Sequence, residues 1–426
     1  MNRLHQEILR SLLSVPTAPF AEAAMAAVVR TWAGRFGLNV KQDRAGNLFL
    51  RHAKARASGP RWVYAAHMDH PGFIALRQKG RTVWAQFRGG VRAEFFPHAR
   101  IVLFAEGGPV RAVVESVRRD GKAPWQLCRA RLDESGAVAP GTIGMWDLPA
   151  MRLARGRLAS RACDDVVGCA AVVCALGEIA SRDPSADVTG LLTVAEEAGL
   201  VGATAACLAG SIPRGSRVVA IETSAAQRHV PLGSGVVVRV GDRAWTFDPS
   251  LTAHVAAAAA ALAKRDKQFR FTRQLMPGGV CESTAYCLWG YSATGLCLPL
   301  GNYHNMGEGN RIAAERVDAG DFESLVTLLV ALPQDGREVG ETGAGIRKRL
   351  AGRLAAWKKV RGGSLAGNSC LNLRPNQGTR RQERSSHESD PCRTALPIRT
   401  SRQRHDRGVD EHASDGTGHA AGRRSG

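Results

Sequence analysis

Residues 61–69 read RWVYAAHMD, a short apolar run that ends in a histidine and an aspartate. Residues 61–66 have the length and the aromatic and β-branched content of a buried strand. His67 follows this strand directly, and Asp69 comes two residues later. Ligands of open α/β sheets bind at the carboxyl ends of the strands, so a functional site is expected at this strand end.

Helical and strand-like patterns alternate through the first 334 residues. Further strands are expected at 191–195, 217–221 and 294–298, and a hairpin at 38–51 with its turn at 44–47. Helices are expected at 21–36, 166–180, 199–209, 250–264, 283–289 and 316–332. Strands that alternate with helices indicate an α/β fold, with a mostly parallel sheet and helices on both faces.

Residues 75–157 interrupt this alternation. They hold short strand-like pieces at 82–87, 99–104, 110–117 and 125–132, separated by glycines and turns. Short strands at such spacing predict a small all-β domain. We therefore expect a catalytic domain made of residues 1–74 and 158–334, with the β-domain inserted between its two segments.

Two segments follow this body. Residues 335–360 predict a basic amphipathic helix, which is expected to dock on its own domain, with a membrane surface or a partner as alternatives; its apolar side chains are Ile346, Leu350, Leu354 and Trp357. Residues 361–426 contain twelve arginines, seven acidic residues and no lysine. They show no apolar periodicity, so we expect a disordered tail; a nucleic-acid-binding arm is the less favoured alternative.

The composition limits the class of protein. The chain has 426 residues, 44% of them hydrophobic, and a net charge of +20. No apolar run approaches the roughly 18 residues of a membrane-spanning helix, and the charged N-terminus differs from a secretory signal. Its ten cysteines include no CxxC pair, which favours reduced thiols in a cytoplasmic protein. The charge alone would suit a nucleic-acid-binding protein, but no recognition motif accompanies it, so neither a nucleic-acid nor a membrane partner is expected.

Histidines and carboxylates gather where the predicted strands end. They are His67, Asp69, Asp164, Asp165, Glu196, Glu197, Glu222 and His304. Taken singly, each has an ordinary explanation: the aspartate pair could cap a helix, the glutamate pair could be a solvated surface, and the last histidine could be a loop residue. Because all of them fall at one predicted edge of the sheet, a shared site is the better interpretation.

Two imidazoles and three carboxylates suit a pair of divalent cations, zinc first, with cobalt or manganese as alternatives. One carboxylate can bridge the two ions, which leaves each ion one histidine and one further carboxylate. An additional acid that binds neither ion can then accept a proton from bound water. Adjacent glutamates at a strand end supply such a pair of a ligand and a base.

The sequence resembles the tetrahedral and glutamyl aminopeptidases, a family of cytoplasmic dinuclear metallo-aminopeptidases within the wider group of zinc peptidases and deacylases. The resemblance covers about residues 4–334. It is carried by AAHMDHPGF (65–73), RACDDVVGCA (161–170), LLTVAEEAGLVGA (191–203), VVAIETS (218–224) and GNYHN (301–305). This family's fold also carries a small inserted β-domain.

The resemblance implies a role for each position. His67 and Glu222 would bind one metal, Glu197 and His304 the other, and Asp164 would bridge them, with Asp165 as the competing candidate. Asp69 would hydrogen-bond to the second ring nitrogen of His67. Glu196 would act as the general base. Glu282 is a further candidate, for holding the substrate α-amine.

Two positions depart from the family pattern. His70 stands where family members commonly have glutamate, which changes the pocket but removes no ligand. Glu222 stands where they commonly have aspartate. In the wider group of zinc peptidases, glutamate there accompanies carboxypeptidases and N-acyl-amino-acid deacylases more often, so these activities are the alternative expectation.

The expected activity is removal of N-terminal residues from peptides. A hydroxide bridging the two metals would attack the scissile carbonyl, and Glu196 would take its proton and pass it to the leaving amine. The expected partners are peptide substrates and further copies of the chain. A homo-oligomer, typically a dodecamer built through the inserted domain, is implied by the resemblance alone.

Overall fold

A computed structural model of the chain describes residues 1–56, 61–119, 121 and 125–360. Its centre is an eight-stranded sheet in the order β1-β2-β12-β3-β13-β16-β14-β15. In chain order these strands are β1 (Leu38–Gln42), β2 (Leu48–His52), β3 (Trp62–His67), β12 (Val188–Thr193), β13 (Arg217–Ala225), β14 (Val236–Gly241), β15 (Phe271–Leu275) and β16 (Ser292–Leu300).

The middle of this sheet is parallel. Strands β12, β3, β13 and β16 run in the same direction, whereas β2 and β14 pair with them antiparallel. The predicted α/β class is therefore confirmed. The last two strands of the sheet, β14 and β15, were not anticipated; β15 lies at the sheet edge and is only partly buried, so it lacks a continuous apolar run.

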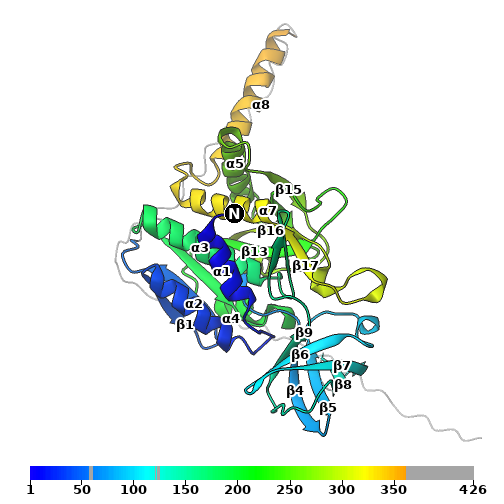
Figure 1. Ribbon diagram of the computed structural model, residues 1–426. Helices are drawn as coiled ribbons and strands as arrows, with labels where there is room; N and C mark the ends of the chain where they lie inside the picture. Colours follow the sequence, from blue (N-terminus) through cyan, green and yellow to red (C-terminus); the bar gives the residue numbers. More distant parts are fainter. Residues whose placement is uncertain (57–60, 120, 122–124, 361–426) are drawn as a thin grey trace, which may run out of the picture. The chain divides into compact units, whose positions relative to one another are not determined.

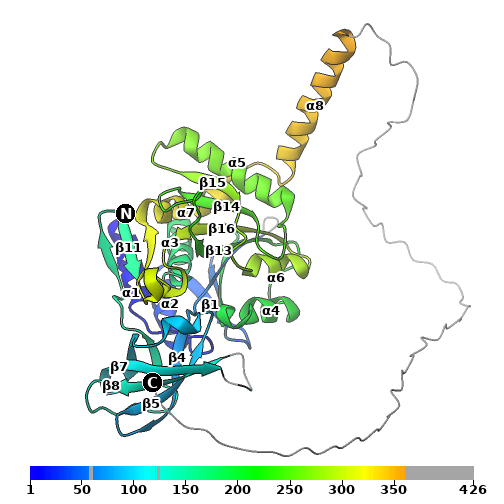
Figure 2. The ribbon, with the colours of Figure 1, turned by 90° about the vertical axis from the view of Figure 1, so that its right-hand side faces the viewer.

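Helices cover both faces of the sheet, as predicted (Figures 1 and 2). On β3, Trp62, Tyr64 and Ala66 face one core, and Val63 and Ala65 face the other. The first core is closed by α1 (Arg3–Leu13), α2 (Ala23–Arg35), α3 (Val166–Arg182), α5 (Pro249–Arg265) and α7 (Ala319–Ala331). The second core is closed by α4 (Val201–Leu208) and α6 (Glu282–Leu288).

The inserted segment forms a closed barrel in the order β4-β5-β8-β7-β6-β9. The strands are β4 (Gly72–Lys79), β5 (Thr82–Arg88), β6 (Arg100–Ala105), β7 (Gly108–Arg119), β8 (Gln126–Leu132) and β9 (Ile143–Trp146). The barrel thus spans residues 72–146 rather than 75–157. The next strands, β10 (Arg152–Ala154) and β11 (Arg157–Ser160), join β17 (Glu315–Asp318) in a separate three-stranded sheet.

The predicted helix over residues 316–332 begins later than expected. Its first residues form β17, which pairs with β11. Asp318 then accepts hydrogen bonds from the backbone N–H groups of Gly320 and Asp321. This aspartate is the N-cap of α7, and an N-cap residue has an extended backbone, so the helix can start only at Ala319.

The C-terminal helix is present but shorter than predicted. It is α8 (Glu341–Val360), and it begins after Gly340, whose φ of 106° favours glycine. Its side chains Ile346, Leu350, Leu354 and Trp357 are between 43% and 56% exposed. These side chains are thus largely exposed, although α8 contacts α5, and their packing on the domain stays a prediction. The predicted tail at 361–426 lies outside the described residues.

None of the helices within the described residues combines the length and the apolar character that a bilayer crossing requires.

A buried histidine ties the N-terminal helix to the body. His5 of α1 is buried, with its Nδ1 3.0 Å from Oε1 of Glu323 in α7 and its Nε2 3.0 Å from Oε1 of Glu178 in α3. Burial alone would lower the pKa of His5, but the two glutamates outweigh it and raise the pKa from 6.5 to about 9. His5 is therefore charged at neutral pH.

Replacing His5 by glutamine is expected to destabilise the protein by about 2 kcal/mol at pH 6. A raised histidine pKa stabilises the fold fully below pH 6.5, and this contribution disappears as the pH rises through about 9. Urea unfolding of wild type and variant at pH 6 and pH 10 would measure it. The exposed His229→Gln is the control, and an equal difference at both pH values would contradict the ion-pair explanation.

Candidate metal centre

His67 is the last residue of β3, and a hydrogen bond fixes the orientation of its imidazole ring. Its Nδ1 donates to the backbone carbonyl of Asp69 at 3.1 Å, so Nε2 faces the carboxylates. This nitrogen lies 3.5 Å from Oδ1 of Asp164 and 3.5 Å from Oε1 of Glu222. Fixing one ring nitrogen in this way leaves the other available as a metal ligand.

His304 is oriented in the same manner from the opposite side. It follows β16 in a short 3₁₀ helix, Tyr303–Asn305, and its Nδ1 donates to the backbone carbonyl of Gly90 at 2.8 Å. Gly90 belongs to the barrel segment, so the inserted domain helps to build the site. Nε2 of His304 lies 3.0 Å from Oε1 of Glu197 and 3.4 Å from Oδ2 of Asp164.

Asp164 lies between the two histidines, with one carboxylate oxygen toward each. The neighbouring Asp165 reaches only one side, where its carboxylate lies within 4.8 Å of ligand atoms of His67 and Glu222. Although Asp165 occupies the N-cap position of α3, its side chain makes no capping hydrogen bond. The helix-capping explanation of this aspartate is therefore wrong. Gly168 leaves room for the carboxylate of Asp165. A Cβ atom at position 168 would lie only 2.2 Å from Oδ2 of Asp165.

The carboxylate of Asp69 fixes the backbone of Glu196 and Glu197 through two hydrogen bonds. It accepts from the backbone N–H of Glu196 at 2.9 Å and from that of Glu197 at 3.1 Å. It lies 3.6 Å from Nδ1 of His67, whose hydrogen bond goes to the carbonyl of Asp69 instead. The expected contact between Asp69 and His67 thus exists through the backbone, and the carboxylate positions Glu196 and Glu197.

Several residues around the site have a left-handed backbone. Ala195 precedes the glutamate pair with a φ of 52°, and Asn302, His304 and Asn305 have φ values of 58°, 53° and 62°. Such conformations cost free energy in residues other than glycine and collect at functional sites. Here they turn the chain sharply after β12 and β16, which directs Glu196, Glu197 and His304 toward one another.

Two buried residues support the site without facing it as ligands. Glu315 of β17 accepts from the backbone N–H groups of Cys163, Asp164 and His304, at 2.7, 3.0 and 2.8 Å. His70 contacts the backbone carbonyl of Asp164 and, at 3.0 Å, Oδ1 of Asn305. Sequence reasoning missed Glu315, because a single glutamate at the start of a strand carries no local signal.

Burial and mutual repulsion shift the pKa values of the acids. Burial, strengthened by the charge of Asp164, raises the pKa of Glu222 to about 8. The pKa of Glu196 is raised well above its usual range, by burial and then by Glu222, Glu197 and Asp69, although His67 opposes the shift. Asp164 moves the other way: burial would raise its pKa, but His304 and His67 lower it.

The donor set fits a pair of divalent cations. Among the described residues, Oδ1 of Asp164, both carboxylate oxygens of Asp165 and Oε1 of Glu197 are buried without a hydrogen-bond partner. Buried carboxylate oxygens are costly unless a hydrogen bond or a cation satisfies them. Imidazole and carboxylate ligands suit zinc, cobalt and manganese. The side chains of His67, Asp164, Glu197, Glu222 and His304 thus lie close together, and their role as ligands stays a prediction.

A cavity of about 100 Å³ opens beside these residues. Its lining includes Asp164, Glu196, Glu197, Glu222 and His304 at one end, and Arg239, Met276, Cys281 and Tyr303 further along. Glu282 does not line it. The side chain of Glu282 is buried, and its Oε2 accepts from the hydroxyl of Tyr286 at 3.3 Å; its role with the substrate α-amine stays a prediction.

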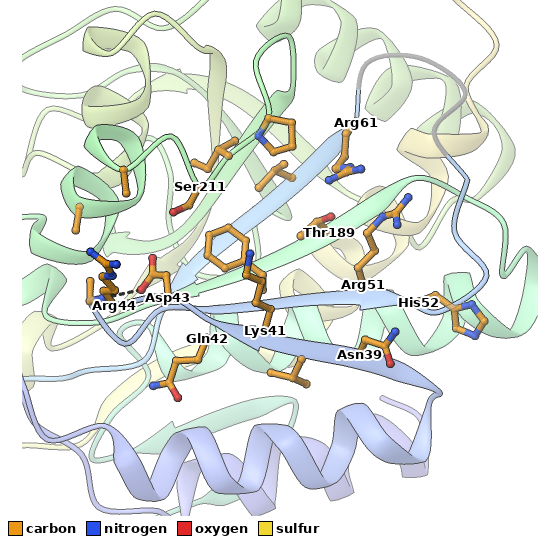
Figure 3. A pocket seen from close by; sticks show the side chains of 18 of the residues that line it. Asn39, Lys41, Gln42, Asp43, Arg44, Arg51, His52, Arg61, Thr189 and Ser211 are labelled. Carbon is orange, nitrogen blue, oxygen red and sulfur yellow. Dashed lines mark hydrogen bonds between the residues drawn. The ribbon is translucent and has the colours of Figure 1, made fainter.

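A larger cavity, of about 1050 Å³, lies on the face of β1, β2, β12 and β3. Figure 3 shows its polar side chains, among them Lys41, Arg44, Arg51 and Arg61. Arg51 and Arg61 both pair with Asp187. None of the metal-centre residues lines this cavity, so it is separate from the candidate site.

Several solved structures share this fold. PhTET1-12s, described as a dodecamer in the asymmetric unit, is 20% identical, and the match covers 78% of this chain and 99% of that one with a TM-score of 0.63. The TET1 peptidase of Pyrococcus horikoshii is also 20% identical, with coverages of 77% and 99% and a TM-score of 0.63. An aminopeptidase from the archaeon Desulfurococcus kamchatkensis is 20% identical, with coverages of 80% and 96% and a TM-score of 0.63. At this identity the likeness establishes the fold.

The family is established by the sequence match rather than by these structures. None of the curated proteins compared with the chain matches it. The M42 glutamyl aminopeptidase family, however, matches residues 46–328. Because that match spans well over half of the chain and includes every residue from His67 to His304, the chain belongs to the M42 glutamyl aminopeptidases, a family of metallo-aminopeptidases.

Proposed function

We propose that this metallo-aminopeptidase hydrolyses N-terminal peptide bonds with Glu196 as its general base. The observation that carries the proposal is the position of Asp164, whose two carboxylate oxygens each face one histidine. This arrangement supports a two-cation site in which His67 and Glu222 hold one ion, Glu197 and His304 hold the other, and Asp164 is shared.

Two cations bound there would polarise the scissile carbonyl and make water acidic enough to attack it near neutral pH. The protein's own side chains would carry out the proton transfers. Oε2 of Glu196 lies 3.9 Å from Nε2 of His67, and Glu196 lines the cavity beside the proposed ligands, where it would take a proton from water. Glu196 would then deliver that proton to the leaving amine.

Asp69 and Glu315 serve the site as positioning residues in this proposal. Asp69 fixes the backbone of Glu196 and Glu197, so the base and the adjacent ligand keep opposite orientations. Glu315 accepts hydrogen bonds from the backbone N–H groups of Asp164 and His304 and so holds these two residues in place.

A carboxypeptidase or N-acyl-amino-acid deacylase activity of the same site is the second candidate. It is favoured by Glu222, the longer acid at a position where aspartate is common among the aminopeptidases that the sequence resembles. Its side chain lies on the His67 side of the centre, where the extra methylene changes how far the ligand oxygen reaches.

Chelation and terminus-specific substrates together test the proposal. The purified full chain, loaded with zinc, should release amine from aminoacyl-anilides, and 1,10-phenanthroline should reduce the rate at least 100-fold, reversibly on adding zinc back. Metal analysis should find about two ions per chain. Hydrolysis of N-acyl amino acids without hydrolysis of any free-amine substrate would support the second candidate instead.

The remaining properties are also proposals. Zinc is the proposed metal because the donors are two imidazoles and a few carboxylates. A closed homo-oligomer is proposed because the structurally similar PhTET1-12s is a dodecamer and the TET1 peptidase of P. horikoshii assembles into a tetrahedron or an octahedral shell. A cytoplasmic location is proposed because the eight cysteines within the described residues are all free.

A further inference from the structure

The larger cavity, on the face of β1, β2, β12 and β3, is built from side chains that alternate along these strands. Residues two apart on a strand share a face, so Phe49 and Arg51 of β2 lie on the same side of the sheet, beside Thr189 of β12. The end of α4 and residues 211–213 line the cavity from above the sheet. Its volume of about 1050 Å³ is sufficient for a small-molecule ligand.

Two arginines meet at one end of this cavity (Figure 3). Nε of Arg51 donates to Oδ1 of Asp187 at 3.1 Å, and Nε of Arg61 donates to the same oxygen at 2.8 Å. Both guanidinium groups are therefore close together, and both stay protonated. Because one carboxylate serves two arginines, one positive charge at this end of the cavity is left for a ligand.

Thr189 adds a hydroxyl next to these arginines. In the sheet it is the direct partner of Arg51 on one side and of Val63 on the other. It is only 5% exposed, and its Oγ1 is buried without a hydrogen-bond partner among the described residues. A buried hydroxyl is unfavourable until a partner satisfies it. Since Thr189 lines the cavity, a bound ligand is the partner that its hydroxyl can reach.

The middle of the cavity combines a further cation with an aromatic ring. Lys41 of β1 is the direct partner of Phe49 on β2, and both line the cavity. The carboxylate of Asp43, also in the lining, is occupied by the backbone N–H groups of residues 45–47. The cavity thus offers positive charge at its polar end and an apolar surface, formed by Phe49 and Ile212, beside it.

We propose that this cavity binds an aromatic phosphate monoester, with its phosphate on Arg51, Arg61 and Thr189. The aromatic ring of the ligand lies against the half-buried Phe49, in the contact that flat rings favour. A phosphate suits the polar end better than a carboxylate, because it carries close to two negative charges and three acceptor oxygens. Guanidinium groups bind such oxygens in pairs. Nucleoside monophosphates and simple aryl phosphates share this chemistry.

Calorimetric titration of the zinc-loaded full chain with four compounds tests the proposal. Adenosine monophosphate or phenyl phosphate should bind at least about 10-fold more tightly than adenosine and inorganic phosphate, each of which lacks one of the two recognised groups. Tighter binding of adenosine monophosphate than of phenyl phosphate identifies a nucleoside phosphate, and otherwise an aryl phosphate is identified. Equal binding of inorganic phosphate, or no binding of either ester at millimolar concentration, would overturn the proposal.

Two variants place the ligand in this cavity. Arg51→Gln should weaken binding of the preferred ester at least about 10-fold, and it leaves Asp187 paired with Arg61, so the fold is kept. Thr189→Val should weaken binding about 3- to 10-fold. Its thermal unfolding midpoint should equal or exceed that of wild type, because the hydroxyl it removes has no partner in the protein. The matched control is Arg273→Gln, at an exposed arginine of β15 outside the cavity, which should change nothing.

The same variants separate this cavity from the metal centre, since zinc ions also attract phosphate. A phosphate held by zinc would bind Arg51→Gln as tightly as wild type and would be lost from Glu197→Gln, and that result would contradict the proposal. Loss of binding in Arg51→Gln and Thr189→Val, with binding kept in Glu197→Gln, supports it whether or not any peptide is hydrolysed. If Arg51→Gln fails to fold, the affinity of Thr189→Val decides, and an affinity equal to that of wild type counts against the site.

Discussion

Replacing Glu196 by glutamine is expected to lower kcat by about 100- to 10,000-fold, the usual contribution of a positioned general base. Glutamine has nearly the same shape and keeps the backbone hydrogen bond from Glu196 to Asp69, but its amide cannot accept the proton. Because Glu196 is not among the proposed ligands His67, Asp164, Glu197, Glu222 and His304, the variant should retain its metal.

Metal content and turnover must therefore be measured on the same sample. The matched control is Glu197→Gln. In the wild type, Oε1 of Glu197 lies 3.0 Å from Nε2 of His304, so this variant should lose metal as well as activity. If Glu196→Gln turned over substrate at a rate close to wild type, Glu196 would not be the base.

Replacing Asp164 by asparagine is expected to reduce the affinity for both metal ions at least 100-fold, and the activity with it. Its two oxygens face His67 at 3.5 Å and His304 at 3.4 Å, so both halves of the centre depend on it. An asparagine amide has no negative charge to offset two cations, and it offers a single acceptor oxygen.

Asp165→Asn is the informative companion variant. The carboxylate of Asp165 groups only with His67 and Glu222, so this variant should affect one ion and leave the ion between Glu197 and His304. Calorimetric titration of each metal-free protein with zinc measures the number of zinc sites. If Asp165→Asn lost both ions and Asp164→Asn lost neither, the bridging role would move to Asp165.

The site was largely predictable because its members follow strands. In a parallel sheet all carboxyl ends meet at one edge, so residues after separate strands become neighbours. His67 ends β3, and Glu222 lies in the second half of the adjacent parallel strand β13. Glu196 and Glu197 follow β12. Strand prediction from apolar runs was sufficient to place them together, and the choice of residue types indicated the chemistry.

Other parts of the site could not be predicted from local patterns. Glu315 reaches the centre from a short strand of a second sheet, and Gly90 contributes a backbone carbonyl from the barrel segment. Backbone carbonyls leave no trace in the sequence, and one glutamate at the start of a short strand is indistinguishable from a solvated one. Strand β14, by contrast, reads VVVRVG, a local apolar run that the sequence does show.

The linear chain by itself determined the α/β class, the inserted β-domain and the residues proposed as ligands, because hydrophobic period and residue chemistry are local properties. The tertiary structure decided which of two adjacent aspartates faces both histidines and which acid is held by the backbone. Those depend on side-chain direction and on contacts between residues far apart in the chain, such as Gly90 with His304. Only the packed fold specifies them, since the free energy of each contact is set by neighbours that local sequence does not name.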